Sequence, residues 1–250
     1  MAPEQLVFLF AAGVAAGVVS VLVSLASIIS YPALLAVGLP PVTANVTNTV
    51  ALVLTGVGAA IGSQRELAGL RPMVLRLAVA AVAGGFTGAV LLLALPDRVF
   101  ELVAPVLIAG ASLLLLAQPR LRRRPALQPR GLRTGPVAAF TATSVYLGYF
   151  GAAGGILSLA VLSTIIDRRF HDVNAAKNTL AAFANGAAAV LFVLMGPVQW
   201  AYVVPLALGM FTGGLVGPTI ARRLPAPALR LAVAACGLTV AAVLAWGTYR

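Results

Sequence analysis

The chain consists of apolar runs that are long enough to cross a lipid bilayer as helices. Only 9% of its 250 residues are charged, and the six acidic ones lie near the ends of the apolar runs. A typical soluble domain carries about 25% charged residues, and a disordered chain needs low hydrophobicity and high net charge. A bilayer core about 30 Å thick takes about 20 helical residues. The pattern therefore predicts an all-α polytopic membrane protein.

Six of the runs are expected to cross the membrane as single helices. They cover residues 42–61, 72–95, 99–116, 173–195, 200–221 and 228–246. Two further stretches are interrupted, 6–38 by serines and Pro32 and 135–166 by glycines. Proline breaks a helix and glycine weakens it, so each stretch is predicted to be a broken helical hairpin.

The two halves of the chain resemble each other on either side of an arginine-rich segment. An Asn-Thr pair followed by glycine starts at Asn48 and again at Asn178, and the tripeptide Phe-Thr-Gly starts at Phe86 and again at Phe211. The shared order indicates an internal duplication. We therefore expect a first transmembrane repeat over residues 1–118, a basic cytoplasmic linker over 119–134 and a second repeat over 135–250.

Both halves also contain a pair of glycines four residues apart. The pairs are Gly84 with Gly88 and Gly209 with Gly213. Small residues at this spacing let two membrane helices approach closely, so these positions are predicted to be helix-packing faces.

The arginine and lysine residues indicate how the chain is oriented. If each interrupted stretch dips into the membrane and returns on the same side, only Arg98 and Arg250 of the 17 basic residues lie outside. Cytoplasmic loops carry an excess of such residues. Each half then holds one re-entrant hairpin and three spans, and the odd number of crossings makes the second repeat inverted. Eight crossings with a parallel repeat remain the alternative. The expected location is a bacterial inner membrane, with the central basic loop in the cytoplasm.

The rare residue types exclude several kinds of chemistry. One cysteine and one histidine cannot form a disulfide or a Cys/His metal cluster. No carboxylate lies in the middle of an apolar run, which argues against an acid/base pair. The basic residues lie between apolar runs and not on one soluble face. We therefore expect no enzymatic activity, no cofactor, no metal and no nucleic-acid partner.

The hairpin tips are the first candidate site. A half-helix that starts inside the membrane points its free N–H groups and positive dipole end inward, where they can bind an anion. The candidate residues at the two tips are Ser27 and Ser30 in the first half, and Gly151, Gly154, Gly155 and Ser158 in the second. The alternative is that these small residues only let helices pack closely.

The polar faces of the following helices are the second candidate site. Spacings of three and four residues place Asn45, Asn48 and Thr49 on one helix face, and the matching set in the second half is Asn174, Asn178 and Thr179, with Lys177 beside it. A buried amide must meet a partner helix, water or a ligand, so hydrogen bonding between helices is the alternative to a site. Lys177 either contacts an anion or extends to the cytoplasmic surface, of which the second is favoured.

These segments resemble the TauE/SafE family of sulfite and organosulfonate exporters. The resemblance rests on residues 27–34 leading through 38–42 into 44–49, and on 154–158 leading into 174–179. It implies a bacterial inner-membrane permease for small sulfur-containing anions such as sulfite or sulfoacetate. The glycine-rich element of the family falls on Gly151, Gly154 and Gly155. The first half departs from it, because residues 27–30 read Ser-Ile-Ile-Ser, so the two half-sites would offer different donors.

The resulting hypothesis is an anion exporter that works by alternating access, with one central site where the hairpins meet. Its expected partners are a small anionic substrate and the lipid bilayer, and a homodimer is left open. The alternatives are a transporter of another small organic anion or solute, a non-transporting membrane scaffold or sensor, and an integral-membrane enzyme.

Overall fold

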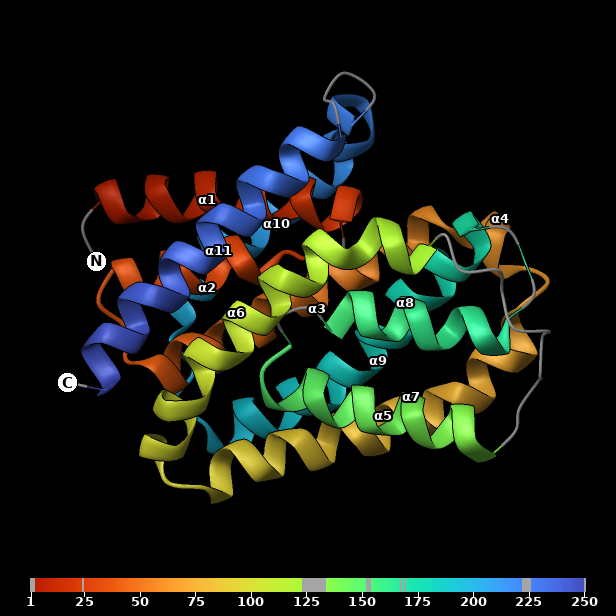
Figure 1. The fold of residues 1–250 in the computed structure, drawn as a ribbon, viewed down its shortest axis with the longest axis horizontal. Coiled ribbons are helices and arrows are strands. Elements are labelled where there is room, and N and C mark those ends of the chain that lie inside the picture. Colours follow the sequence, from red (N-terminus) through yellow and green to blue (C-terminus); the bar gives the residue numbers. More distant parts are fainter. Residues whose placement is uncertain are drawn as a thin grey trace.

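The computed structural model describes residues 3–23, 25–122, 134–151, 154–166, 168, 170–221 and 226–249. These residues form helices and no strand (Figure 1). The helices are α1 (Pro3–Val23), α2 (Ser27–Ala36), α3 (Pro41–Gly62), α4 (Gln64–Leu67), α5 (Arg71–Ala94), α6 (Asp97–Arg122), α7 (Thr134–Tyr149), α8 (Gly154–Ile165), α9 (Phe170–Met195), α10 (Trp200–Ala221) and α11 (Ala226–Tyr249).

The apolar runs predicted to cross the membrane are helices. By length and composition, α1, α5, α6, α9 and α11 could each span a bilayer, judged on the described residues alone. Helices α3 and α10 have 22 residues each, which is also enough to span. Large apolar side chains such as Val79 and Leu194, which are 72% and 75% exposed, cover the outside of the bundle. This surface suits lipid, and the all-helical membrane fold is confirmed.

Both interrupted stretches are broken helices, as predicted. The first breaks between α1 and α2, and the second between α7 and α8. Pro32 is not at the break but inside α2. Gly38, with φ +93°, ends α2, and the N–H of Leu39 bonds to the carbonyl of Leu34. This is a common way to end a helix, and it needs a residue without a side chain.

Each hairpin packs its first helix against the other half of the chain. Helix α1 lies against α10, and α7 lies against α5. A Cβ built on Gly213 would overlap the carbonyl of Val14 on α1, and one built on Gly88 would overlap the carbonyl of Val145 on α7. The glycine pairs are therefore helix-packing faces, as predicted, and the two halves are intertwined.

The glycine contacts also give the direction of these helices. Along α1 and α10, Gly13 lies against Gly209 and Gly17 against Gly213, so the two helices are parallel. Along α5 and α7, Gly84 lies against Ser144 and Gly88 against Gly148, so these two are parallel as well.

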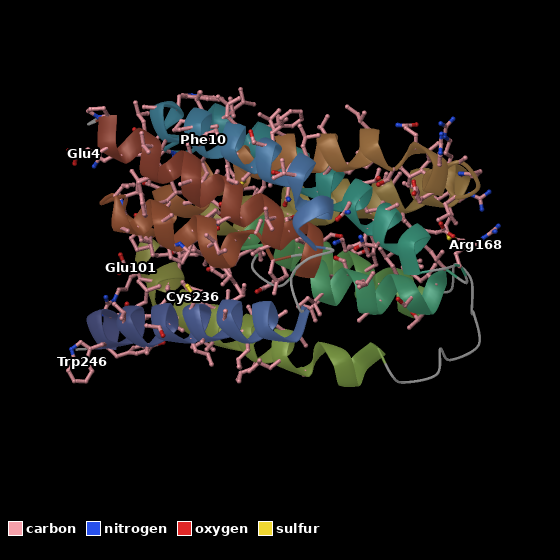
Figure 2. All side chains as sticks on the ribbon, turned by 90° about the horizontal axis from the view of Figure 1, so that it is seen from above. Glu4, Phe10, Glu101, Arg168, Cys236 and Trp246 are labelled. Carbon is pink, nitrogen blue, oxygen red and sulfur yellow. The ribbon has the colours of Figure 1, made fainter. Side chains whose placement is uncertain are left out.

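The molecule has two ends, which we name after residues labelled in Figure 2, the Trp246 end and the Arg168 end. Helix α10 starts beside the start of α3, because the N–H of Gln199 bonds to Oγ1 of Thr47. Since α1 is parallel to α10, the hairpin α1–α2 opens at this end. Figure 2 shows Glu4, in the first turn of α1, at the same end as Trp246. Helix α5 starts near Arg168, so the hairpin α7–α8 opens at the Arg168 end (Figure 1).

Helices at equivalent positions of the two halves make equivalent contacts. The pair α1–α10 corresponds to α7–α5, and α3–α10 corresponds to α9–α5. These matches agree with a duplication, while the inversion of the repeats in a membrane stays a prediction. The linker arginines at 123–133, together with Arg169, Arg222 and Arg223, lie outside the described residues, so the linker and the domain boundaries also stay predictions.

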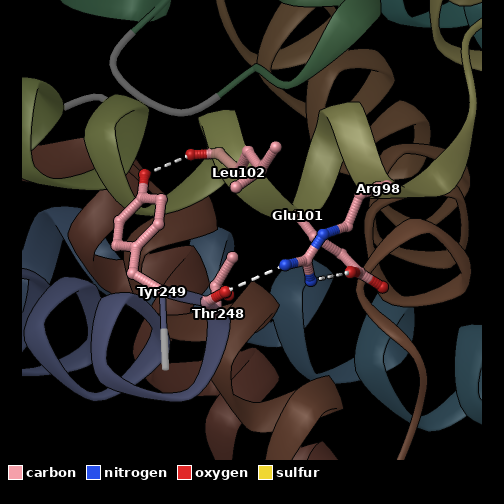
Figure 3. Close-up of polar contacts among 5 residues, drawn as sticks. All are labelled: Arg98, Glu101, Leu102, Thr248 and Tyr249. Atoms are coloured by element: carbon pink, nitrogen blue, oxygen red, sulfur yellow. Dashed lines mark hydrogen bonds and ion pairs between the residues drawn. The ribbon is translucent and has the colours of Figure 1, made fainter.

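Polar contacts join the two halves at the Trp246 end. Arg98 on α6 pairs with Glu101 at 3.3 Å and donates to the carbonyl of Thr248 on α11 (Figure 3). The hydroxyl of Tyr249 donates to the carbonyl of Leu102 (Figure 3). These contacts hold the start of α6 against the end of α11.

Candidate functional site

The first hairpin tip leads into the buried start of α2. Ser27 is its first residue and Ser30 follows on the next turn, and both are buried. The hydroxyl of Ser30 donates to the carbonyl of Ala26 at 3.2 Å. No side chain caps the N-terminus of α2, and the N–H groups of Ile28, Ile29 and Ser30 already bond to backbone carbonyls of the preceding turn. The start of α2 therefore offers a ligand its positive dipole end.

The second hairpin tip depends on glycine. Gly151 has φ +77°, a conformation that side chains disfavour, and its N–H bonds to the carbonyl of Tyr146 as α7 ends. Helix α8 begins at Gly154, where a Cβ would overlap the side chain of Leu147. Gly155 is half-buried, and Ser158, one turn further on, is 1% exposed. The glycines thus shape this tip, while their role in binding a substrate stays a prediction.

The polar face of α3 joins both hairpins. Asn48 donates from Nδ2 to Oγ of Ser27 at 3.3 Å, which connects α3 to the start of α2. Asn45 donates from Nδ2 to the carbonyl of Tyr149 at 2.8 Å, which connects α3 to the second tip. Thr49 bonds to the carbonyl of Asn45 within the helix. The structure therefore brings Ser27, Asn45 and Asn48 together, and adds the end of α7 to them.

The polar face of α9 is less buried, with the exception of its lysine. Asn174, Asn178 and Thr179 are half-buried, and Thr179 bonds to the carbonyl of Ala175 in its own helix. Lys177 is only 2% exposed, although it lies between these residues. The expectation that Lys177 extends to the surface is therefore wrong. Its flexible stem folds inward, which leaves an ammonium group inside the bundle.

The two polar faces lie on opposite sides of the point where α3 and α9 cross. Gly56 meets Ala182 there, and Val46 lies near Gly196, so the two helices run in opposite directions. Asn48 lies eight positions before Gly56, and Asn178 lies four positions before Ala182. The two asparagines are thus separated by about 18 Å of helical rise. Among the described contacts, none joins the two sets, so the single shared site stays a prediction.

An aromatic cluster covers the second tip. The ring of Phe150 lies 5.4 Å from Tyr31 and 5.5 Å from Phe100, and the ring of Phe100 lies 5.8 Å from Tyr149. Edge-on pairs at these distances stabilise the contact. This cluster was not predicted. The available signal was the Tyr-Leu-Gly-Tyr-Phe-Gly run at 146–151, where aromatic rings flank the glycines.

Several buried oxygen atoms near the tips have no hydrogen-bond partner. They include Oδ1 of Asn45 and of Asn48, the hydroxyl of Tyr31 and Oγ of Ser158. Buried polar atoms are nearly always bonded, so each unbonded one marks a place where a ligand or water is expected. No group of Cys, His, Asp and Glu that could hold a metal was found in the described residues.

Comparison with known proteins identifies the family. The model of the family described as "Sulfite exporter TauE/SafE" matches residues 9–244 of the chain. The chain belongs to the TauE/SafE family. The "Probable membrane transporter protein YfcA" of Escherichia coli (strain K12) is 27% identical over 223 residues, which cover 87% of this chain and 81% of the relative. A "Probable membrane transporter protein" of Haemophilus influenzae is 26% identical over 224 residues, covering 86% and 84%. No solved structure matches the chain. The protein is therefore a membrane transporter of the TauE/SafE family.

Proposed function

We propose that this transporter exports small sulfur-containing anions, such as sulfite or organosulfonates, by alternating access across a bacterial inner membrane. The two repeats would be inverted, with the basic Arg168 end and the central linker in the cytoplasm. The anion would enter at the Arg168 end, pass between the hairpin tips and leave at the Trp246 end.

The burial of Lys177 is the observation that carries the proposal. It is the eighth residue of α9, about 10 Å of helical rise from the start of the helix, and it is almost completely buried. A positive charge inside the bundle attracts an anion and repels a cation more strongly than the same charge does in water. The charge of Lys177 therefore favours an anion over a cation at this depth of the path.

Other groups on the path also favour an anion. The starts of α2 and α8 both lie inside the bundle and present their positive dipole ends. The candidate substrate-binding side chains remain Ser27, Ser30, Asn45, Asn48, Thr49, Ser158, Asn174, Lys177, Asn178 and Thr179. A negative-inside potential favours anion exit by about 2.3 kcal/mol per charge per 100 mV, so export needs no carboxylate in the membrane.

Flux through purified protein in proteoliposomes tests the proposal. Wild-type protein is expected to move sulfite and sulfoacetate, and faster when the potential drives anions outward. Lys177→Gln is expected to lower this flux at least about tenfold, because the ion-paired substrate loses its partner. Arg168→Gln, at an exposed position, is the control and should leave the flux within about twofold. If wild-type protein moves neither anion, or if Lys177→Gln transports normally, the proposal is wrong.

A further inference from the structure

At the contact between α3 and the second hairpin tip, the buried Oδ1 of Asn45 can only accept a hydrogen bond, and it has no donor. We propose that Asn45 recognises a hydroxyl or protonated oxygen on the transported anion, so that the site prefers a hydroxyl-bearing oxyanion over a matched one without a donor. This inference rests on the proposed function, since it concerns the substrate of that same path.

The amide of Asn45 can point only one way. Its Nδ2 donates to the carbonyl of Tyr149 at 2.8 Å, and a carbonyl oxygen can only accept. Turning the amide over would place two acceptors against each other. The remaining atom of the amide, Oδ1, is therefore an acceptor that needs a donor, and it has none.

The orientation of the Asn48 amide is not fixed in this way. Its partner is the hydroxyl of Ser27, which can donate as well as accept. The amide of Asn48 can thus be turned over without loss, so either of its atoms could face a ligand.

Tyr31 provides the complementary group. It lies on α2, one turn after Ser27, and its ring contacts Phe150, the residue that follows Tyr149. Its hydroxyl is also buried and unbonded. Asn45 and Tyr31 therefore reach the same hairpin tip without bonding to each other. A hydroxyl on a ligand can accept from Tyr31 and donate to Asn45, and so satisfy both.

An oxyanion that lacks such a group leaves both atoms unbonded. Sites built to bond a hydroxyl reject the analogue that lacks it far more strongly than sites lined by apolar groups do. The positive dipole end of α2 attracts the charged end of either ligand equally, so the discrimination falls on Asn45 and Tyr31.

Two ligands of equal charge and similar size test this inference. They are 2-hydroxyethanesulfonate and propane-1-sulfonate, in which a methyl group replaces the hydroxyl. Binding is measured by isothermal titration on the purified protein in lipid nanodiscs. We expect wild-type protein to bind 2-hydroxyethanesulfonate at least about tenfold more tightly.

Variants separate the two contacts. Asn45→Leu and Tyr31→Phe are each expected to reduce the preference to below about threefold, mainly by weakening the binding of 2-hydroxyethanesulfonate. Ser112→Ala removes a buried hydroxyl that bonds to Ile108 in its own helix, and this control should keep the preference of the wild type. Tyr31→Phe removes a single atom, so it provides the answer if Asn45→Leu does not fold.

The outcomes distinguish the two proposals. Equal binding of both sulfonates to wild-type protein overturns the role of Asn45 and leaves the anion exporter standing. A preference that survives in Tyr31→Phe and in folded Asn45→Leu also overturns it. If neither sulfonate binds to wild-type protein, organosulfonate export fails, and this inference fails with it.

Discussion

Adjacent glycines on α10 allow a direct test of the close packing between α1 and α10. Gly213 is buried against α1, and a Cβ built on it would lie 2.8 Å from the carbonyl carbon of Val14 and would overlap its oxygen. Ordinary contact begins at 3.4 Å, so Gly213→Ala forces the two backbones apart by at least 0.6 Å. At Gly214, an added Cβ meets no atom within 4 Å.

The two substitutions are therefore expected to have opposite effects. Overpacking of this kind typically destabilises a protein by about 1–3 kcal/mol, and here the strain falls on backbone atoms that cannot change rotamer. Gly214→Ala should be neutral or stabilise by up to about 1 kcal/mol, because alanine favours the helix.

Thermal unfolding in a mild detergent, followed by far-UV circular dichroism, measures the difference. Gly17→Ala, on the α1 side of the same contact, should behave like Gly213→Ala. Equal shifts of the midpoint in Gly213→Ala and Gly214→Ala would show that helix propensity outweighs the packing, and would refute the reasoning.

The remaining predictions concern the second hairpin tip and the two ends. Gly151→Ala places a side chain at φ +77° and should destabilise the protein by about 1–2 kcal/mol in the same assay, whereas Gly186→Ala, where a Cβ meets nothing within 4 Å, should not. Single cysteines at Gly69 and at the exposed Gln199, introduced after replacement of the exposed Cys236, should react with membrane-impermeant maleimide from opposite sides of sealed vesicles. Labelling of both from one side would contradict the proposed topology.

The sequence predicts the helices well, because the length of an apolar run directly reflects the thickness of the bilayer. The run predicted at 200–221 has the bounds of α10, and the one at 42–61 falls within one residue of α3 at each end. The breaks follow from serine and glycine clusters that a continuous apolar helix does not need. The short α4 was not predicted, since four residues between two spans carry no periodic signal.

The contacts of the candidate site were less predictable, because they join different helices, and the bond between Asn45 and Tyr149 joins residues 104 positions apart. The spacing of Asn45 and Asn48 shows that they share a face, yet it does not show that Asn45 reaches Tyr149 on the other hairpin. In the same way, the pair Gly209 and Gly213 marks a packing face without identifying α1 as its partner. Lys177 shows most clearly what the sequence does not determine, since a long flexible side chain can fold inward or outward from the same backbone position.

The intertwined packing determines which parts could move in the transport cycle that we propose. Helices α1 and α10 belong to different halves, yet their backbones touch at glycines, and so do those of α5 and α7. Such contacts cannot slide without overlap of the backbones, so each pair should move as one body. The bond from Asn45 to Tyr149 and the rings around Phe150 depend on side chains, which can separate and form again. Helix α5 touches α9 in the same way, because a Cβ built on Gly85 would overlap the carbonyl of Ala184. Motion of one whole repeat against the other would break all three of these contacts. The parts expected to move relative to each other are therefore the pair α1–α10 and the group formed by α5, α7 and α9.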